Sequence, residues 1–253
     1  METKFWQLHS ENDEAIFKQA GALLRDGELV AFPTETVYGL GANGLDGRAV
    51  RRIYEAKGRP SDNPLILHIA DISEIYALTE NLNDIALKLA KNFWPGPMTL
   101  VVPKSKIIPD EVSAGLPTVA VRFPVNKDAQ RLIKAAGVPV AAPSANLSGK
   151  PSPTTAQDVM EDMDGKIAAV LDGGKCAVGL ESTVIDTTGA VATILRPGQI
   201  TPEMIAKVLG VVELDGVIKG DETAVPKAPG MKYRHYAPQA PMYLCKNTLI
   251  MDK

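Results

Sequence analysis

Two cations with phosphate-binding chemistry stand close together in the chain. Lys57 and Arg59 flank a glycine and precede a rigid proline at position 60. Arginine offers a planar fork of donors and lysine a point charge, so a stiff loop with both suits a polyphosphate. The window 48–59 holds five basic residues and one acidic residue, so the pair could equally belong to a solvated helix end. Both interpretations stay open at this point.

A further cation, Arg122, ends the apolar run at residues 118–122. Burying an arginine within an apolar strand is costly unless an anion pairs with it. An internal salt bridge would satisfy this requirement, and so would the carboxylate of a bound ligand. The sequence alone does not choose between them.

Hydroxyl and amide side chains follow several other apolar runs. Thr34 and Thr36 lie in the segment 33–38, and Ser144 and Asn146 follow the run at 138–142. Ser182 and Arg196 stand at glycine-flanked ends of two later runs. Open α/β sheets place ligands at the carboxyl ends of their strands, so these groups together predict an anion-binding site. Each of these residues alone is weak evidence for such a site; Thr34, for example, could simply cap a turn.

Motifs of covalent and dinucleotide-dependent enzymes fit poorly. The sequence contains no G-x-S-x-G elbow and no Walker A motif, so a protein nucleophile is not indicated. Residues 39–44 match G-x-G-x-x-G, but six residues separate the first glycine from the preceding strand, whereas the dinucleotide turn is immediate. We expect a glycine-rich turn there.

Short apolar runs alternate with amphipathic segments, which is typical of an α/β layer fold. The expected strands are 28–32, 64–69, 98–102, 118–122, 138–142, 167–171, 182–186 and 192–196. The expected helices are 10–26, 46–57, 82–93, 126–136, 154–163 and 201–209. After about residue 213 no periodic apolar face continues. We therefore expect a catalytic domain at 1–212, a linker at 213–241 and the stub of a second domain at 242–253.

Composition narrows the function classes. The formal net charge is −3 over 253 residues, which excludes a nucleic-acid binder that works by bulk positive charge. Without an 18-residue apolar run or a leader-like N-terminus, we expect a cytoplasmic protein that does not enter a membrane. The two cysteines and three histidines are too scattered to suggest a metal cage.

Several motifs together carry a family resemblance. They are PTETVYGL (33–40), KGRP (57–60), PL with His68, WPGPMT (94–99), VRFP (121–124), APSANLSG (142–149), ESTV (181–184) and LRPG (195–198). In this order, over residues 32–198, they resemble the YrdC family of threonylcarbamoyl-adenylate synthases. Residues 229–238 resemble the linker of the two-domain branch of that family. Because the chain ends soon afterwards, we expect its C-terminal domain to be missing or truncated.

The resemblance implies a twisted, mixed β-sheet with flanking helices around a concave, positively charged cleft. It also implies a reaction in which L-threonine, bicarbonate or CO₂, and ATP give threonylcarbamoyl-AMP and pyrophosphate. The product serves the modification of tRNA to threonylcarbamoyladenosine, through a separate transferase. We also consider a weak contact between this chain and tRNA.

Family positions imply residue roles. Lys57 and Arg59 would be catalytic and hold phosphates. The other ATP-binding positions are Asn63, Thr118, Ser144, Asn146, Ser152 and Arg196, with His235 and Tyr236 of the linker folding back over the cleft. The threonine-binding positions are Thr36, His68, Arg122, Ala142 and Ser182. Mg²⁺ is expected to accompany ATP, held by phosphates and waters, and no tightly bound organic cofactor is expected.

Two other functions are weighed against this one. An RNA-binding module would use the basic stretch 48–59 without ATP chemistry, and its affinity would fall steeply with salt. A carbamoyl-transferring maturation enzyme would share the fold, but such proteins carry zinc-finger and acylphosphatase-like regions for which this chain has neither the cysteines nor the length.

Overall fold

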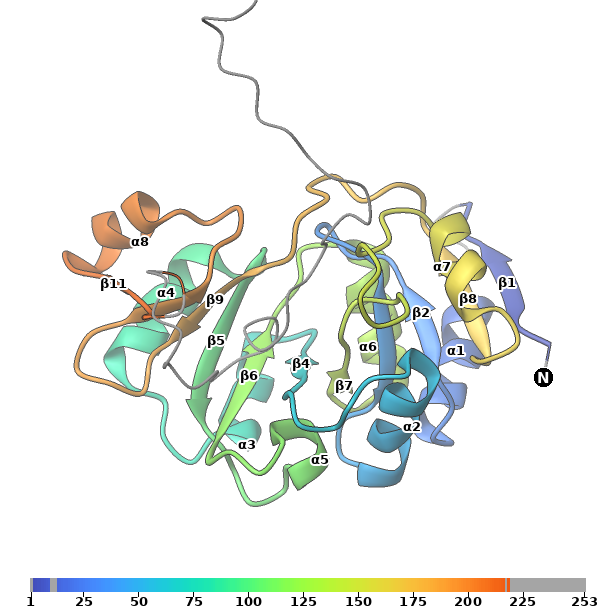
Figure 1. Ribbon diagram of the computed structural model, residues 1–253, viewed down its shortest axis with the longest axis horizontal. Helices are drawn as coiled ribbons and strands as arrows, with labels where there is room; N and C mark the ends of the chain where they lie inside the picture. Colours follow the sequence, from blue (N-terminus) through green and yellow to red (C-terminus); the bar gives the residue numbers. More distant parts are fainter. Residues whose placement is uncertain (1, 10–12, 217, 219–253) are drawn as a thin grey trace, which may run out of the picture.

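Eleven strands join into one mixed sheet in the computed structural model, which describes residues 2–9, 13–216 and 218 (Figure 1). The strands are β1 (Lys4–Gln7), β2 (Val30–Phe32), β3 (Gly39–Asn43), β4 (Ile66–His68), β5 (Met98–Pro103), β6 (Thr118–Arg122), β7 (Val140–Ala141), β8 (Ala169–Asp172), β9 (Thr183–Asp186), β10 (Thr193–Arg196) and β11 (Glu213–Leu214). Their order across the sheet is β1-β8-β2-β3-β7-β4-β6-β5-β9-β10-β11. The predicted α/β class with a mixed sheet is confirmed.

Eight α-helices and one 3₁₀ turn connect these strands in the described part of the chain. They are α1 (Glu14–Arg25), α2 (Gly47–Lys57), the 3₁₀ turn Ile72–Glu74, α3 (Ile75–Leu78), α4 (Asp84–Phe93), α5 (Asp110–Ser113), α6 (Lys127–Ala136), α7 (Ala156–Met163) and α8 (Pro202–Leu209). Capping explains several boundaries, since the side chain of Asn83 accepts from a backbone N–H at the start of α4, and that of Asn126 does so at α6. Gly58 ends α2 in the left-handed conformation that glycine adopts without strain.

Helices pack on both faces of the sheet. Phe17 of α1 and Leu132 of α6 cluster with Val30 and Phe32 of β2. Ala31, which points to the opposite face of the same strand, belongs to the larger core that α2, α4, α7 and α8 share. A third, smaller cluster contains strand residues alone and includes Ile66, Val101 and Ala120. The functional site lies beside this third cluster.

Residues 39–43 form a strand, so the expected glycine-rich turn is wrong. β3 pairs antiparallel with β2, with Gly39 opposite Phe32 and Gly41 opposite Val30. A Cβ on Gly41 would lie 2.9 Å from a methyl group of Val140 and 3.1 Å from the Phe32 ring. Position 41 requires glycine because the side chains of Val140 and Phe32 leave no room for a Cβ atom.

The central strands bring distant residues into register. His68 of β4 pairs with Arg122 of β6, and Arg122 pairs in turn with Thr99 of β5. Directly opposite residues point to the same face, so these three form one polar row across the sheet. The row lies next to the apolar third cluster.

The sheet continues beyond the expected domain boundary at 212, because β11 pairs parallel with β10. Most of the expected linker at 213–241 and all of the expected stub at 242–253 lie outside the described residues. No helix in the described part of the chain is long and apolar enough to span a membrane.

Candidate active site

A cleft opens beside the polar row. Strand ends and the loops after them line it. The lining residues are Thr34, Thr36, Val37, Tyr38, Gly39, Arg59, Pro64, Leu65, Ile66, His68, Arg122, Ala142, Pro143, Ser144, Glu181, Ser182 and Arg196. All five predicted threonine-binding positions are among them, together with Arg59, Ser144 and Arg196.

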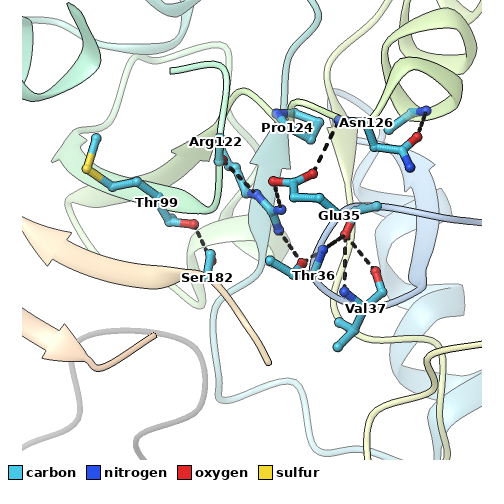
Figure 2. A network of polar contacts seen from close by, with 12 residues as sticks. Glu35, Thr36, Val37, Thr99, Arg122, Pro124, Asn126 and Ser182 are labelled. Carbon is cyan, nitrogen blue, oxygen red and sulfur yellow. Dashed lines mark hydrogen bonds and ion pairs between the residues drawn. The ribbon is translucent and has the colours of Figure 1, made fainter. Parts of the chain in front are cut away.

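Arg122 is nearly fully buried and is held from two sides (Figure 2). Its Nη2 lies 2.5 Å from Oε1 of Glu35, and its Nη1 donates to Oγ1 of Thr36 at 2.9 Å. The internal salt bridge anticipated as one alternative is therefore present. Because Arg122 also lines the cleft, the second alternative, a ligand carboxylate, remains available to the same guanidinium.

His68 lies beside Arg122 and is buried. Its ring packs edge-on against Phe32, and its Nδ1 lies 3.2 Å from the carbonyl oxygen of Ile66. Burial, with a smaller contribution from the positive charge of Arg122, lowers the pKa of His68 to about 3. The imidazole is therefore neutral at physiological pH and contributes shape and a hydrogen bond.

Ser182 connects the threonine-side and nucleotide-side predictions. Its Oγ lies 2.7 Å from Oγ1 of the buried Thr99, the last member of the polar row (Figure 2). Arg196 donates from Nη2 to the same Oγ at 3.0 Å and from Nε to the Ser182 carbonyl at 3.0 Å. The hydroxyl is thereby fixed in position by two residues on neighbouring strands.

Lys57 is buried at the end of α2. Its Nζ donates to the carbonyl oxygens of Ser144 and Asn146, which ties the helix end to the loop after β7. Burial, followed by the nearby charge of Arg59, lowers the pKa of Lys57 to about 7, while Asp162 opposes the shift. Near pH 7 this lysine is therefore only partly protonated in the ligand-free protein.

Arg59 follows Gly58 and lines the cleft. Its guanidinium lies 5.9 Å from the centre of the Tyr54 ring, and its Nη2 donates to the carbonyl oxygen of Asn63 at 3.2 Å. These contacts direct the arginine toward the loop 58–64. The alternative that Lys57 and Arg59 belong to a solvated helix end does not fit the structure, because Lys57 is buried and Arg59 lines the cleft.

The remaining predicted nucleotide positions occupy different places. Asn63 and Asn146 are buried, and their side chains include polar atoms without a protein hydrogen-bond partner. Ser152 donates to Oε1 of Glu181, a lining residue, at 2.5 Å. Thr118 begins β6, at the opposite end of that strand from Arg122. The predicted positions His235 and Tyr236 lie outside the described residues.

Three residues of this neighbourhood carried no role in the sequence-based prediction: Glu35, Thr99 and Glu181. The signal for Glu35 was present, because a buried arginine needs an anion and Glu35 is the carboxylate of a hydroxyl-rich segment. Thr99 carries no such signal, since a threonine in an apolar strand is unremarkable until its partner is known.

Basic residues of α2 face acidic partners. Arg51 contacts Glu111, Arg52 forms a two-point pair with Glu28 at 2.6 and 2.9 Å, and Arg48 lies 3.6 Å from Asp46. The local excess of positive charge on which the RNA-binding alternative depended is thereby offset.

Residues 22–198 match the family model described as telomere recombination (Sua5/YciO/YrdC), and residues 200–253 match the model described as threonylcarbamoyl-AMP synthase, C-terminal domain. The expectation that the C-terminal domain is missing or truncated is therefore not supported, because that domain is detected from residue 200. The motif-based resemblance included residues 229–238, which lie within this second match, but it interpreted them as a linker and the residues after them as a stub.

Curated relatives agree with both matches. The threonylcarbamoyl-AMP synthase of Pyrococcus abyssi is 55% identical over 228 residues, which cover 90% of this chain and 67% of that protein. The Bacillus subtilis protein of the same name is 52% identical over 254 residues, covering 98% of this chain and 73% of that protein. A crystal structure of P. abyssi Sua5 complexed with L-threonine superposes with a TM-score of 0.90 at 51% identity, covering 95% of this chain and 70% of that one.

Proposed function

The chain belongs to the Sua5/YciO/YrdC family, and we propose that it is a threonylcarbamoyl-AMP synthase that joins L-threonine, bicarbonate or CO₂, and ATP. The observation that carries this proposal is one cleft with two kinds of anion-binding group. Arg122, neutral His68 and Ser182 suit an amino acid, and Arg59 with the adjacent Lys57 suits a polyphosphate.

The reaction requires two bond-forming steps. The threonine amine adds to CO₂ with loss of a proton and forms a carbamate. A carbamate oxygen then attacks the α-phosphorus of ATP, and the bond to the pyrophosphate oxygen breaks. Neither step needs a protein nucleophile, because positioning and charge stabilisation can supply much of the acceleration.

The contacts support the residue roles that we propose. Arg122 would hold the threonine carboxylate, with Thr36, Ala142 and Ser182 completing the pocket. Lys57 and Arg59 would stabilise the negative charge that develops on the phosphates. The other nucleotide-side positions, Asn63, Thr118, Ser144, Asn146, Ser152, Arg196, His235 and Tyr236, are proposed on the resemblance alone.

Mg²⁺ is proposed to enter with ATP. The described residues contain no cluster of three or more His, Cys, Asp or Glu side chains suited to a metal ion, so phosphate oxygens and waters would supply its ligands. We further propose that a separate transferase consumes the product to modify tRNA.

Pyrophosphate release tests the function directly. The full chain with Mg-ATP should release pyrophosphate only when L-threonine and bicarbonate are both present, and the adenylate should be detected by mass spectrometry. Serine should be the poorer substrate, because its missing methyl group loses about 1 kcal/mol of apolar contact. Equal release with threonine or bicarbonate omitted would contradict the proposal.

A further inference from the structure

We propose that Glu35 is a positioning residue for threonine recognition, which holds the Arg122 guanidinium in the orientation that a substrate carboxylate requires. This inference rests on the proposed function, because it assigns the carboxylate to L-threonine. It concerns a residue that touches Arg122 and not the reacting atoms.

The guanidinium of Arg122 is fixed at all three of its nitrogens (Figure 2). Nη2 contacts Glu35, Nη1 donates to Thr36, and Nε donates to the Gly96 carbonyl at 3.4 Å. An arginine carries five N–H donors, so these contacts leave one on Nη1 and one on Nη2 for a ligand. The two ends of a carboxylate match that arrangement.

Glu35 is itself anchored. Its Oε2 accepts from the backbone N–H of Asn126 at 3.3 Å, next to the start of α6. Its backbone carbonyl accepts from the N–H of Val178 at 2.9 Å. The preceding Thr34 accepts from the backbone N–H groups of Thr36 and Val37 through its hydroxyl, which closes a tight turn around Glu35. The carboxylate therefore has little freedom to follow a moving guanidinium.

The ion pair also sets how a ligand is recognised. Both side chains are more than nine-tenths buried, so an unpaired Arg122 would be costly in the ligand-free protein. Pairing with Glu35 neutralises that charge before the substrate arrives. Threonine recognition then depends on where the two remaining N–H groups point, more than on the net charge of the pocket.

Replacing Glu35 with glutamine tests whether Glu35 orients Arg122 for threonine binding. The amide has one acceptor oxygen, which can serve either Arg122 or the Asn126 N–H, and its NH₂ group faces whichever donor is left. We expect the KM for L-threonine and its Kd by calorimetry to rise about tenfold, the effect of weakening one charged hydrogen bond. The KM for ATP and kcat should change less than about twofold, since the nucleotide side is untouched.

The matched control is Glu28→Gln, which weakens the ion pair with Arg52 on α2, away from the cleft. It should leave both KM values unchanged. A second readout compares the Kd of L-threonine with that of L-threoninamide, which lacks the carboxylate. Wild type should prefer threonine strongly, and Glu35→Gln should lose most of that preference. A fold defect alone would reduce the active fraction without changing this ratio.

Outcomes for the two proposals are distinguishable. If wild type releases no threonine-dependent pyrophosphate, the proposed function fails, while the Kd comparison still tests Glu35. If wild type is active and Glu35→Gln binds threonine with unchanged Kd and preference, the positioning role is refuted. Should Glu35→Gln fail to fold, ¹⁵N spectra of wild type decide: a held Arg122 shows separate Nη1 and Nη2 resonances, and a single averaged resonance refutes the role.

Discussion

Raising the pH above 7 is expected to weaken ATP binding, because Lys57 loses its proton in the ligand-free protein. Burial lowers the pKa of this lysine to about 7 from its ordinary 10.5. The phosphates of ATP favour the ammonium form, so the lysine must take up a proton when the nucleotide binds at alkaline pH. The carbonyls of Ser144 and Asn146 accept from Nζ in either protonation state and keep it in place.

The magnitude follows from the titration of a single group. If ATP binds only the protonated form, the Kd rises about fivefold from pH 7 to 8 and about ninefold more from pH 8 to 9. His68 does not contribute, because its pKa of about 3 leaves it neutral throughout this range. The terminal phosphate of ATP, with a second pKa near 6, is already ionised for most of it.

Calorimetry measures both consequences. The Kd of Mg-ATP is determined from pH 7 to 9, and titrations at pH 8 in buffers of different ionisation enthalpy give the number of protons taken up, expected at about 0.9. Lys57→Met keeps a chain of similar length without the titrating group. This variant should bind ATP more weakly at pH 7 and show neither the pH dependence nor the proton uptake.

A wild-type Kd that stays constant from pH 7 to 9, with no proton uptake at pH 8, would refute this reasoning. Lys57 would then be charged throughout, and its burial would not have displaced its pKa. A pH dependence of equal slope in Lys57→Met would assign the effect to another group.

Three further changes give distinct outcomes. Thr99→Val removes the hydroxyl that holds Ser182 while keeping the side-chain shape, so the threonine KM should rise several-fold with unchanged thermal unfolding; an unchanged KM would contradict the role of Thr99. His68→Gln should reduce acid sensitivity: the folded pKa of about 3 lies below the unfolded 6.5, so wild-type stability falls as pH drops from 6.5 toward 3. At pH 4.5 protonation of His68 should lower the free energy of unfolding of the wild type by about 2–3 kcal/mol, measured by urea unfolding, and the variant should not show this loss. Equal loss of stability in both proteins between pH 6.5 and 4.5 would contradict this prediction. Gly21→Ala places a Cβ 2.5 Å from the Ala135 backbone carbon, so α1 and α6 must separate at a cost of about 1–3 kcal/mol; an unfolding midpoint at or above that of wild type would show that the helices adjust freely.

Sequence patterns predicted the strands that carry the site because these strands are continuous apolar runs with clear ends. The run at 118–122 coincides with β6, and 98–102 with most of β5. β3 was not predicted from the sequence because glycine is a poor strand former. The glycines of β3 are needed because the Phe32 ring of the neighbouring strand lies against them. That contact belongs to tertiary structure and leaves no local mark in the sequence.

For the site residues too, the sequence indicated some features, and others depend on tertiary contacts. Arg122 could be singled out because a charge in an apolar run demands a partner. The identity of that partner could not, since Glu35 lies 87 positions earlier and meets it only when the sheet has formed. Likewise, the sequence suggested Lys57 as a phosphate ligand, a role that stays a prediction. It could not show that Lys57 is buried, because the carbonyls that accept from its Nζ belong to residues 144 and 146.

The sheet sets the spacing within the polar row His68–Arg122–Thr99, and we expect this spacing to limit the size of the amino acid that the proposed site accepts. Adjacent strands stand about 4.8 Å apart because backbone hydrogen bonds set that spacing, so the backbone fixes the distance between the Cα atoms of these residues. One residue inserted within β6 would turn Arg122 toward the helix-covered face occupied by Val119 and Val121. We therefore expect insertions and deletions to be compatible with the proposed amino-acid recognition only beyond the ends of these strands.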